Sequence, residues 1–215
     1  MTSALDHLVV LAPTLGAGVR WCETVLGIAP GAGGKHALMG THNRLFSIGS
    51  RVFPQAYFEI IAIDPDAPRP KRARWFGLDE IDLSAGPRLA HLVARSSALD
   101  AQCAELRAIG LDPGKPIAAS RETPQGRLEW RISVRDDGRL LCGGAMPTLI
   151  EWGPVHPSAS MPPSGVTLQS LTLRGVPAAA IEVLNMPGVV FETGRDAAFS
   201  ATLDTPRGRI TLHTD

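Results

Sequence analysis

The stretch LDHLVVL, residues 5–11, decides the fold of this chain, because it returns as LAHLVAR at residues 89–95. Leucine, histidine, leucine and valine recur at one offset, since 89 − 5, 91 − 7, 92 − 8 and 93 − 9 all equal 84. A self-similarity of fixed length indicates a duplicated structural unit. Each copy is a predicted strand that carries a histidine among apolar residues.

The composition is that of an ordinary soluble globular protein of 215 residues, with 44% apolar and 20% charged residues. Lys+Arg and Asp+Glu both total 21, so the net charge is zero and nothing favours nucleic acid or a membrane as partner. The first predicted strand leaves no room for a secretion signal, and the three scattered cysteines indicate buried thiols in a reducing compartment. We therefore expect a cytoplasmic protein.

Each copy opens a unit of one strand, one helix and two or three further strands. In the first unit the apolar periodicity predicts a helix after Pro13-Thr14 and strands at 44–48 and 57–63; in the second, a helix over 97–109 and strands near 128–134 and 148–152. The predicted fold class is α+β, with a first module at 1–83 and a second at 84–153. A proline-rich linker follows at 154–165, and then a truncated third βαββ unit at 166–215, in which Ser170 takes the place of His7.

Four residues stand out, two per unit. His7 and His91 occupy the same place in their opening strands, while Glu59 and Glu151 lie between apolar residues in the final strands. An ionised carboxylate in such a strand is costly unless a cation or hydrogen-bond donors compensate it. If the four side chains converged, they would hold a divalent transition metal with positions open for water or substrate. Each residue alone has an ordinary alternative, a hydrogen-bonded histidine or a glutamate paired with an arginine.

Weaker candidates for substrate contacts are two polar residues before the second strand and two arginines of a later strand. His42 and Asn43 could reach a substrate oxygen or simply cap a loop. Arg127 and Arg131 could clamp a carboxylate or phosphate, or pair with Glu129 between them.

These motifs resemble a known family. The runs Asp6-His7-Leu8-Val9, Tyr57-Phe58-Glu59 and Leu149-Ile150-Glu151-Trp152, together with His91, are similar to those of glyoxalase-like proteins of the vicinal oxygen chelate superfamily. The resemblance implies paired βαβββ modules that form a cupped, half-open barrel. It also implies a divalent metal, Ni, Zn, Mn or Fe, held by His7, Glu59, His91 and Glu151.

The resemblance implies a metal-dependent lyase or isomerase as the first hypothesis. The metal would bind neighbouring oxygens of a small substrate and stabilise an enediolate-like intermediate, and Glu151, or else Glu59, would act as base. One alternative is a metal-free protein that sequesters a small molecule in the same cup. Another is an Fe(II) extradiol-type dioxygenase using a subset such as His7, His91 and Glu151. Exposed sheet edges favour a homodimer.

Overall fold

Two βαβββ modules make up the first part of the computed structural model, which describes residues 2–124 and 126–214. The first module contains β1 (Ser3–Leu11), α1 (Leu15–Val25), β2 (Lys35–His36), β3 (Thr41–Ser47) and β4 (Tyr57–Ile63). The second contains β5 (Arg88–Ser96), α2 (Leu99–Ala108), β6 (Lys115–Thr123), β7 (Gly126–Val134) and β8 (Thr148–Trp152). The predicted α+β class with paired modules, the vicinal oxygen chelate arrangement, is confirmed.

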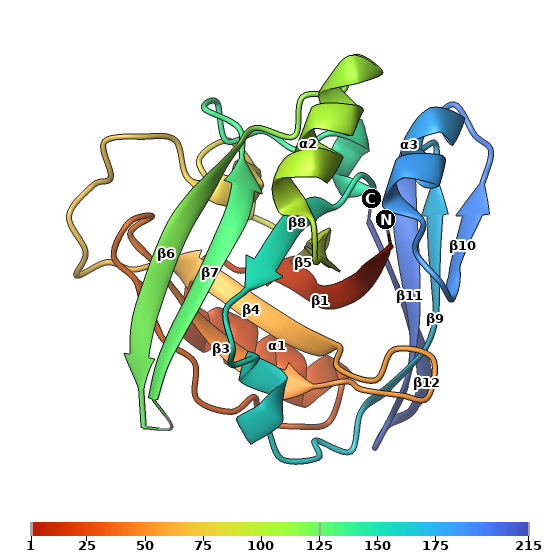
Figure 1. Ribbon diagram of the computed structural model, residues 1–215. Coiled ribbons are helices and arrows are strands. Elements are labelled where there is room, and N and C mark those ends of the chain that lie inside the picture. The colour runs from red at the N-terminus through yellow and green to blue at the C-terminus, as the bar shows by residue number, and fades with distance from the viewer. Residues whose placement is uncertain (1, 125, 215) are drawn as a thin grey trace.

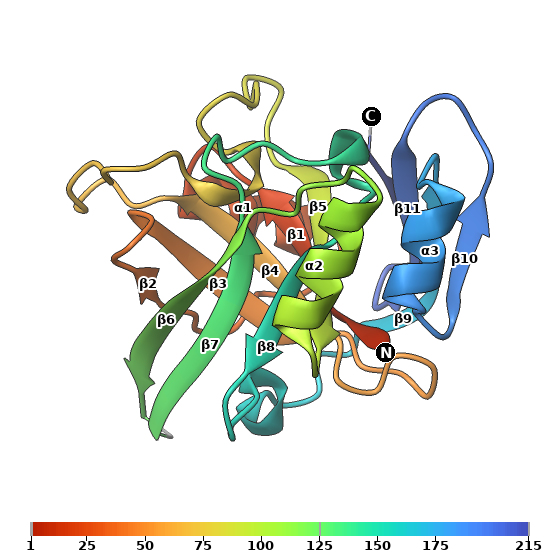
Figure 2. The same cartoon turned by 45° about the horizontal axis from the view of Figure 1, so that its top comes forward.

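One curled sheet of eight strands joins the modules, in the order β2-β3-β4-β1-β5-β8-β7-β6. The first and last strands of each module pair in parallel, and β1 pairs with β5 antiparallel at the centre. The helices α1 and α2 cover the convex face, which leaves a concave face bounded by both halves of the sheet (Figures 1 and 2). The repeated strands found in the sequence therefore lie side by side at the seam.

The seam contains two β-bulges, one in each strand. Leu5 pairs with Ala94 and His7 with Val93, so Asp6 is the extra residue of β1. Val9 pairs with His91 and Val10 with Leu89, so Ala90 is the extra residue of β5. Because 90 − 6 equals the repeat offset of 84, the two bulges are equivalent positions of the duplicated unit.

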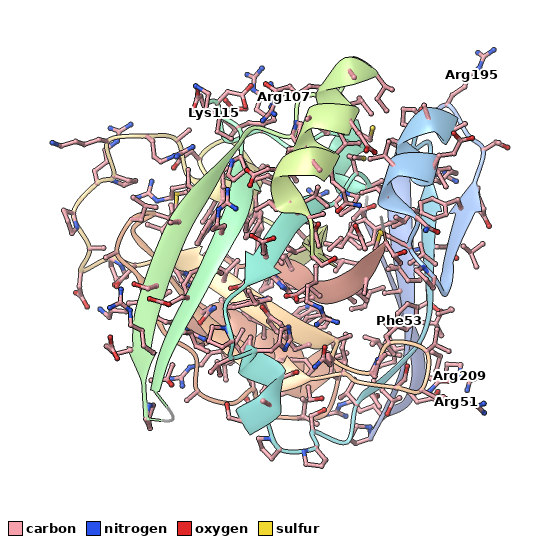
Figure 3. All side chains as sticks on the ribbon, viewed as in Figure 1. Arg51, Phe53, Arg107, Lys115, Arg195 and Arg209 are labelled. Atoms are coloured by element: carbon pink, nitrogen blue, oxygen red, sulfur yellow. The ribbon has the colours of Figure 1, made fainter. Side chains whose placement is uncertain are left out.

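The third unit forms a sheet of its own, in the order β10-β9-β11-β12. It contains β9 (Thr167–Arg174), α3 (Ala178–Leu184), β10 (Val189–Glu192), β11 (Ala198–Thr205) and β12 (Gly208–His213). The unit therefore has one strand more than the truncated βαββ unit that the sequence predicted. Buried residues of all three units, such as Phe58, Leu92 and Leu171, share one core. The buried Phe53 belongs to that core, whereas Arg195 and Arg209 point outward at the periphery (Figure 3). The third unit thus packs on the module pair away from the concave face.

The structure adds two strands to the eight-stranded sheet that the sequence pattern did not indicate, the short β2 and the long β6. Residues 115–123, for which the sequence pattern predicted no strand, form β6, in which Pro116 is the second residue. Since β6 is an edge strand, a missing amide hydrogen there removes no essential sheet bond. Within the described residues, every helix is too short or too polar to span a membrane.

Candidate functional site

A buried carboxylate and a buried imidazole lie side by side at the bulge of β1. Successive side chains of a regular strand point to opposite faces, but a bulge re-aims one of them. Here it places Asp6 beside His7, and His7 Nδ1–H donates to Asp6 Oδ1 at 2.7 Å. Asp6 is fully buried and His7 is 4% exposed, so this pair is shielded from water.

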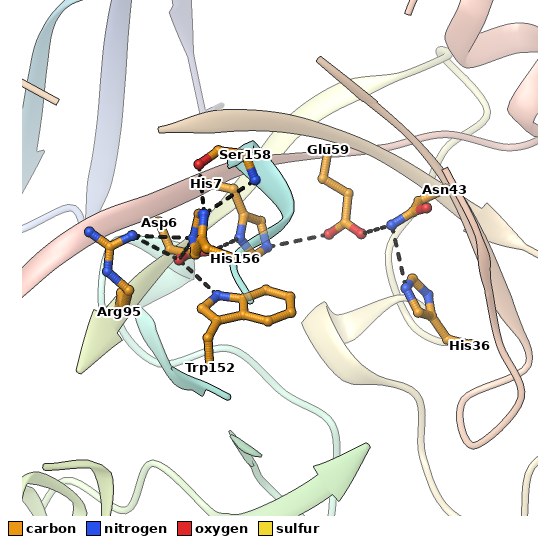
Figure 4. Close-up of polar contacts among 9 residues, drawn as sticks. All are labelled: Asp6, His7, His36, Asn43, Glu59, Arg95, Trp152, His156 and Ser158. Carbon is orange, nitrogen blue, oxygen red and sulfur yellow. Dashed lines mark hydrogen bonds and ion pairs between the residues drawn. The ribbon is translucent and has the colours of Figure 1, made fainter. Parts of the chain in front are cut away.

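The second ring nitrogen of His7 faces Glu59 of β4. His7 Nε2 lies 3.5 Å from Glu59 Oε2, and Asn43 Nδ2 donates to Glu59 Oε1 at 2.6 Å. The ring of Tyr57 stacks on that of His7, with centroids 4.5 Å apart. Figure 4 shows the resulting row of side chains, which runs from Asp6 through His7 and Glu59 to Asn43 and then to His36.

Asp6 is the hub of this network, because it accepts bonds from three different parts of the chain. Besides His7, Trp152 Nε1–H donates to Asp6 Oδ2 at 3.0 Å and His156 Nε2–H donates to the same oxygen at 2.9 Å. The guanidinium of Arg95 lies 3.9 Å from that oxygen. His156 comes from the proline-rich linker, so the linker and the second module both hold the carboxylate that orients His7.

The network fixes the charges of its members. Burial alone would lower the pKa of His7, but hydrogen bonds to Asp6 and Glu59 outweigh it and raise that pKa to about 9. Burial would raise the pKa of Asp6, and its bonds from His156 and His7 instead hold it below the ordinary value. The pKa of Glu59 is likewise lowered, against the effect of burial, mainly by His7. At neutral pH an imidazolium therefore lies between two carboxylates.

His7 and Glu59 open into a small cavity on the concave face, called here the inner pocket. Its free volume is about 30 Å³, room for one or two water molecules. Arg121 of β6 closes one side and reaches Asn43 Oδ1 at 3.5 Å, so the two ends of the curled sheet meet across the cup. The remaining wall is mostly aromatic or aliphatic; the full lining is His7, His36, Asn43, Leu45, Tyr57, Glu59, Trp75, Phe76, Arg121, Trp130, Ile132, Ile150 and Trp152.

The equivalent place in the second module holds no such charge pair. Ala90 stands where Asp6 stands in the first module, and His91 Nδ1–H donates to the carbonyl of Gly144 at 3.0 Å. His91 Nε2 accepts the backbone N–H of Thr148 at 3.2 Å. Burial lowers the pKa of His91 to about 3, so this histidine is neutral, with both nitrogens occupied. Phe76 packs in front of it, with ring centroids 5.4 Å apart.

Glu151 lies on the convex side of the sheet, away from the inner pocket. Val9 pairs with Glu59 and its repeat partner Val93 pairs with Thr148, so the structural counterpart of Glu59 is Thr148. Glu151 is three residues further along, and an odd shift moves a side chain to the other face. There it pairs with Arg131 at 3.1 Å, and its side chain is 30% exposed.

The four-ligand metal site is therefore not assembled from the expected residues. His7 and Glu59 come together, but hydrogen bonds occupy His91 and Glu151 faces the opposite way. Across residues 2–124 and 126–214, no group of three or more His, Cys, Asp or Glu side chains is placed to hold a metal ion. The donors present do not fit the metal that the family resemblance implies. The three ligands expected for a dioxygenase, His7, His91 and Glu151, do not converge either, because hydrogen bonds occupy His91 and Glu151 lies on the opposite face of the sheet.

Of the weaker candidates, only Asn43 belongs to the inner pocket. His42, its neighbour on β3, points to the other face, where its Nδ1 lies 3.9 Å from Asp64. Arg127 and Arg131 lie on the outer face of β7; Arg127 pairs with Glu129 at 3.2 Å. Arg127 thus forms an ion pair on a solvated face, as the alternative to a substrate contact predicted. Arg131 instead forms ion pairs with both Glu151 and Asp100.

Several residues of the site were not singled out from the sequence. Asp6 had a visible signal, since it is an acidic residue inside an apolar strand and its repeat partner is alanine. Arg121 lies on the unpredicted strand β6, and His36 and His156 lie in segments assigned to loop and linker, so periodicity could not find them.

Comparisons with known proteins give a family match and several similar solved structures. A family model described as a glyoxalase-like domain matches residues 5–184. A hypothetical protein from Staphylococcus aureus of known crystal structure is 14% identical, with a TM-score of 0.61 over 92% of this chain and 88% of that chain. Methylmalonyl-CoA epimerase from Mycobacterium tuberculosis is 21% identical, with a TM-score of 0.41 over 73% of this chain and 91% of that chain. No curated protein matches the sequence.

Proposed function

The chain belongs to the glyoxalase-like domain family, and on that premise we propose that it is an isomerase- or lyase-type enzyme acting on a small carbonyl compound. The proposed reaction moves a proton at the carbon next to the carbonyl group. The observation that carries this proposal is the 3.5 Å approach of His7 Nε2 and Glu59 Oε2 at the wall of one pocket.

Glu59 is the proposed base. Its lowered pKa keeps it ionised, and because the contact between Oε2 and His7 is long at 3.5 Å, a lone pair of Oε2 can take a proton from a substrate carbon. As the C–H proton goes to Glu59, the electron pair moves onto the carbonyl oxygen. The same Glu59 then returns a proton to the substrate in an isomerisation.

His7 is the proposed acid. Its raised pKa supplies an N–H donor at neutral pH, next to the place where the oxygen becomes negative. Asp6 acts through His7, because it fixes the ring orientation and stabilises the imidazolium; it is a positioning residue. The aromatic wall excludes water and strengthens both interactions.

The proposal is tested by solvent deuterium exchange, followed by proton NMR, over a panel of 2-hydroxy- and 2-oxo-carbonyl compounds. General acid–base groups contribute about 10²- to 10⁴-fold in rate, so Glu59→Gln and His7→Gln should each lower exchange by that order. His42→Gln is the matched control, since His42 lies on the other face of β3. Equal exchange by wild type and both variants would rule the proposal out.

The metal requirement is measured in the same assay. Because the donor set around His7 does not fit a four-ligand site, we expect exchange to survive dialysis against EDTA. Activity that disappears on dialysis and returns with Ni, Zn, Mn or Fe(II) would reinstate the metal-dependent hypothesis. Elemental analysis of the purified protein gives an independent readout.

A second candidate is sequestration of a small molecule without turnover. The observation in its favour is the aromatic wall formed by Trp75, Phe76, Trp130 and Trp152, a common lining of binding sites. Glu59→Gln separates the two functions, because it would abolish proton exchange and leave binding in place. The homodimer and the cytoplasmic location stay predictions, and light scattering of the purified protein tests the first.

A further inference from the structure

A second, much larger hollow adjoins the inner pocket, called here the linker groove. It has a volume of about 720 Å³ and lies between the loop at 29–33, the tip of the β6–β7 hairpin and the linker at 155–164. Leu45 and Arg121 line both the linker groove and the inner pocket. The two spaces therefore adjoin at these residues.

The two spaces differ in volume, and this difference indicates which part of a substrate each can hold. About 30 Å³ at His7 and Glu59 accepts only the few atoms that react. Sites for small organic molecules usually measure about 300–1,000 Å³, the range in which the linker groove falls. The bulk of a substrate thus has to lie in the linker groove.

Most residues that line the linker groove are apolar or glycine, and Thr123, Ser160 and Ser164 add hydroxyl groups. Leu45, Leu128, Met161 and Pro162 are among the apolar ones, and Val155 is 41% exposed there although valine is usually buried. Such a surface suits a hydrocarbon chain or ring.

Arg121 supplies the one permanent charge among the described residues that line the linker groove. Its guanidinium contacts Asn43 Oδ1 at 3.5 Å and forms no ion pair with a carboxylate of the described chain. A half-buried arginine with only a long contact to a neutral amide is suited to bind an anion. A single guanidinium without a second cation matches a carboxylate better than a doubly charged phosphate.

We propose that the linker groove binds the apolar chain of a carboxylic acid whose carboxylate pairs with Arg121, and that such acids are the substrate class of this protein. This rests on the proposed function. When such an acid also carries the reacting carbonyl group, its chain lies in the linker groove, the hydrogen on the carbon next to that carbonyl faces Glu59, and the carbonyl oxygen faces His7. His156, which lines the linker groove and bonds Asp6, lies at the same junction.

The test is isothermal titration of the full chain with decanoate, decanol and decyl phosphate, below the solubility limit of decanol and the concentrations at which the two anions form micelles. We expect decanoate to bind at least about tenfold more tightly than decanol, since a charge-assisted hydrogen bond contributes about 1.5–3 kcal/mol and 1.4 kcal/mol is tenfold. Decanol binding equal to decanoate, or decyl phosphate binding more tightly, would overturn the proposed class.

Two variants, each with a matched control, test separately how the carboxylate and the apolar chain of the ligand contribute to binding. Arg121→Gln should weaken decanoate at least about tenfold, whereas Arg127→Gln, on the outer face of the same hairpin, should leave it within about twofold. Ala32→Trp fills the linker groove and should weaken decanoate but not propionate, whereas Ala104→Trp, on the exposed side of α2, should change neither. Equal binding by Arg121→Gln and Arg127→Gln would overturn the proposal.

Measuring both decanoate binding and deuterium exchange in Glu59→Gln distinguishes a failure of this proposal from a failure of the proposed function. If this variant binds decanoate like the wild type and exchanges no deuterium, both proposals hold. If decanoate binding depends on Arg121 while Glu59→Gln exchanges normally, only the proposed reaction fails. If exchange depends on Glu59 but decanoate does not bind, only the linker groove proposal fails.

Discussion

Asp6 and Ala90 occupy equivalent bulges in β1 and β5, and only Asp6 carries a carboxylate beside the neighbouring histidine. That difference separates two otherwise repeated histidines. His7 gains a partner that keeps it charged, whereas His91 bonds the carbonyl of Gly144 and stays neutral. A duplicated unit thus supports one asymmetric site.

Asp6→Asn should lower the pKa of His7 from about 9 toward or below its ordinary value of 6.5, because a neutral amide no longer stabilises the imidazolium. The titration of the His7 ring, followed by heteronuclear NMR, measures this. Asp79→Asn, which alters an aspartate paired with Arg74, is the control and should leave the His7 titration unchanged. An unshifted His7 in Asp6→Asn would contradict the role given to Asp6.

The free energy of unfolding should be highest near pH 6.5–7 and fall on both sides. The pKa of His7 is raised in the fold, so its contribution is complete below 6.5 and is lost as the pH rises through about 9. That loss amounts to roughly 3 kcal/mol at 1.36 kcal/mol per pKa unit. The pKa of His91 is lowered to about 3, so the unfolded chain binds the extra proton and stability is lost as the pH falls from 6.5.

Urea unfolding at pH 5, 7 and 9 measures both limbs of this profile. The alkaline loss should shrink in Asp6→Asn, where the raised pKa of His7 is removed, while the acid loss remains. A profile that is flat between pH 7 and pH 9 in the wild type would show that His7 is neutral in the folded protein.

Glu151→Gln should leave deuterium exchange within about twofold of the wild type and change the unfolding free energy by less than about 1 kcal/mol, as partly exposed ion pairs contribute little. Its carboxylate pairs with Arg131 on the convex side, and Arg131 keeps Asp100 as a partner at 2.7 Å. Glu59→Gln is the buried counterpart and should lose exchange. A loss in Glu151→Gln as large as in Glu59→Gln would contradict the placement of Glu151.

Gly114→Ala should destabilise the protein more than Gly110→Ala, although both glycines have nearly the same left-handed backbone, with φ of 84° and 83°. A Cβ at position 110 meets open space, so only the backbone strain of about 1–2 kcal/mol applies. A Cβ at position 114 would collide with the backbone of Val134 and Arg135, at the end of β7. Thermal unfolding of the two variants compares them, and equal losses would show that this contact can relax.

The repeat offset predicted the two central strands and the position of His7, because both depend on local patterns. Helix periodicity and β-prone runs likewise gave α1, α2, β4 and β8. The edge strand β6 was not predicted, because a proline such as Pro116 is typical of a loop. Arg121 lies on β6 and was therefore not identified either. An edge strand is the place where a proline least affects the sheet.

Glu151 shows the limit of transferring a site through a repeat. Residue identity suggested that it matches Glu59, but strand pairing matches Glu59 with Thr148. The register of β8 depends on the length of the β7–β8 connection, which has no counterpart of equal length in the first module. A shift of three residues then decides which face a carboxylate occupies.

The turn at residues 75–77 lies between the inner pocket and a small cavity beside His91. Phe76 has a left-handed backbone (φ 60°), unusual for a bulky residue, and its ring lines both the inner pocket and the small cavity at His91. Replacing it by glycine would relax the backbone and enlarge the space on both sides of the turn, beside Trp75, which lines the same two cavities. Substrate range in this protein could thus be widened from a connecting turn, without altering any group that handles the proton.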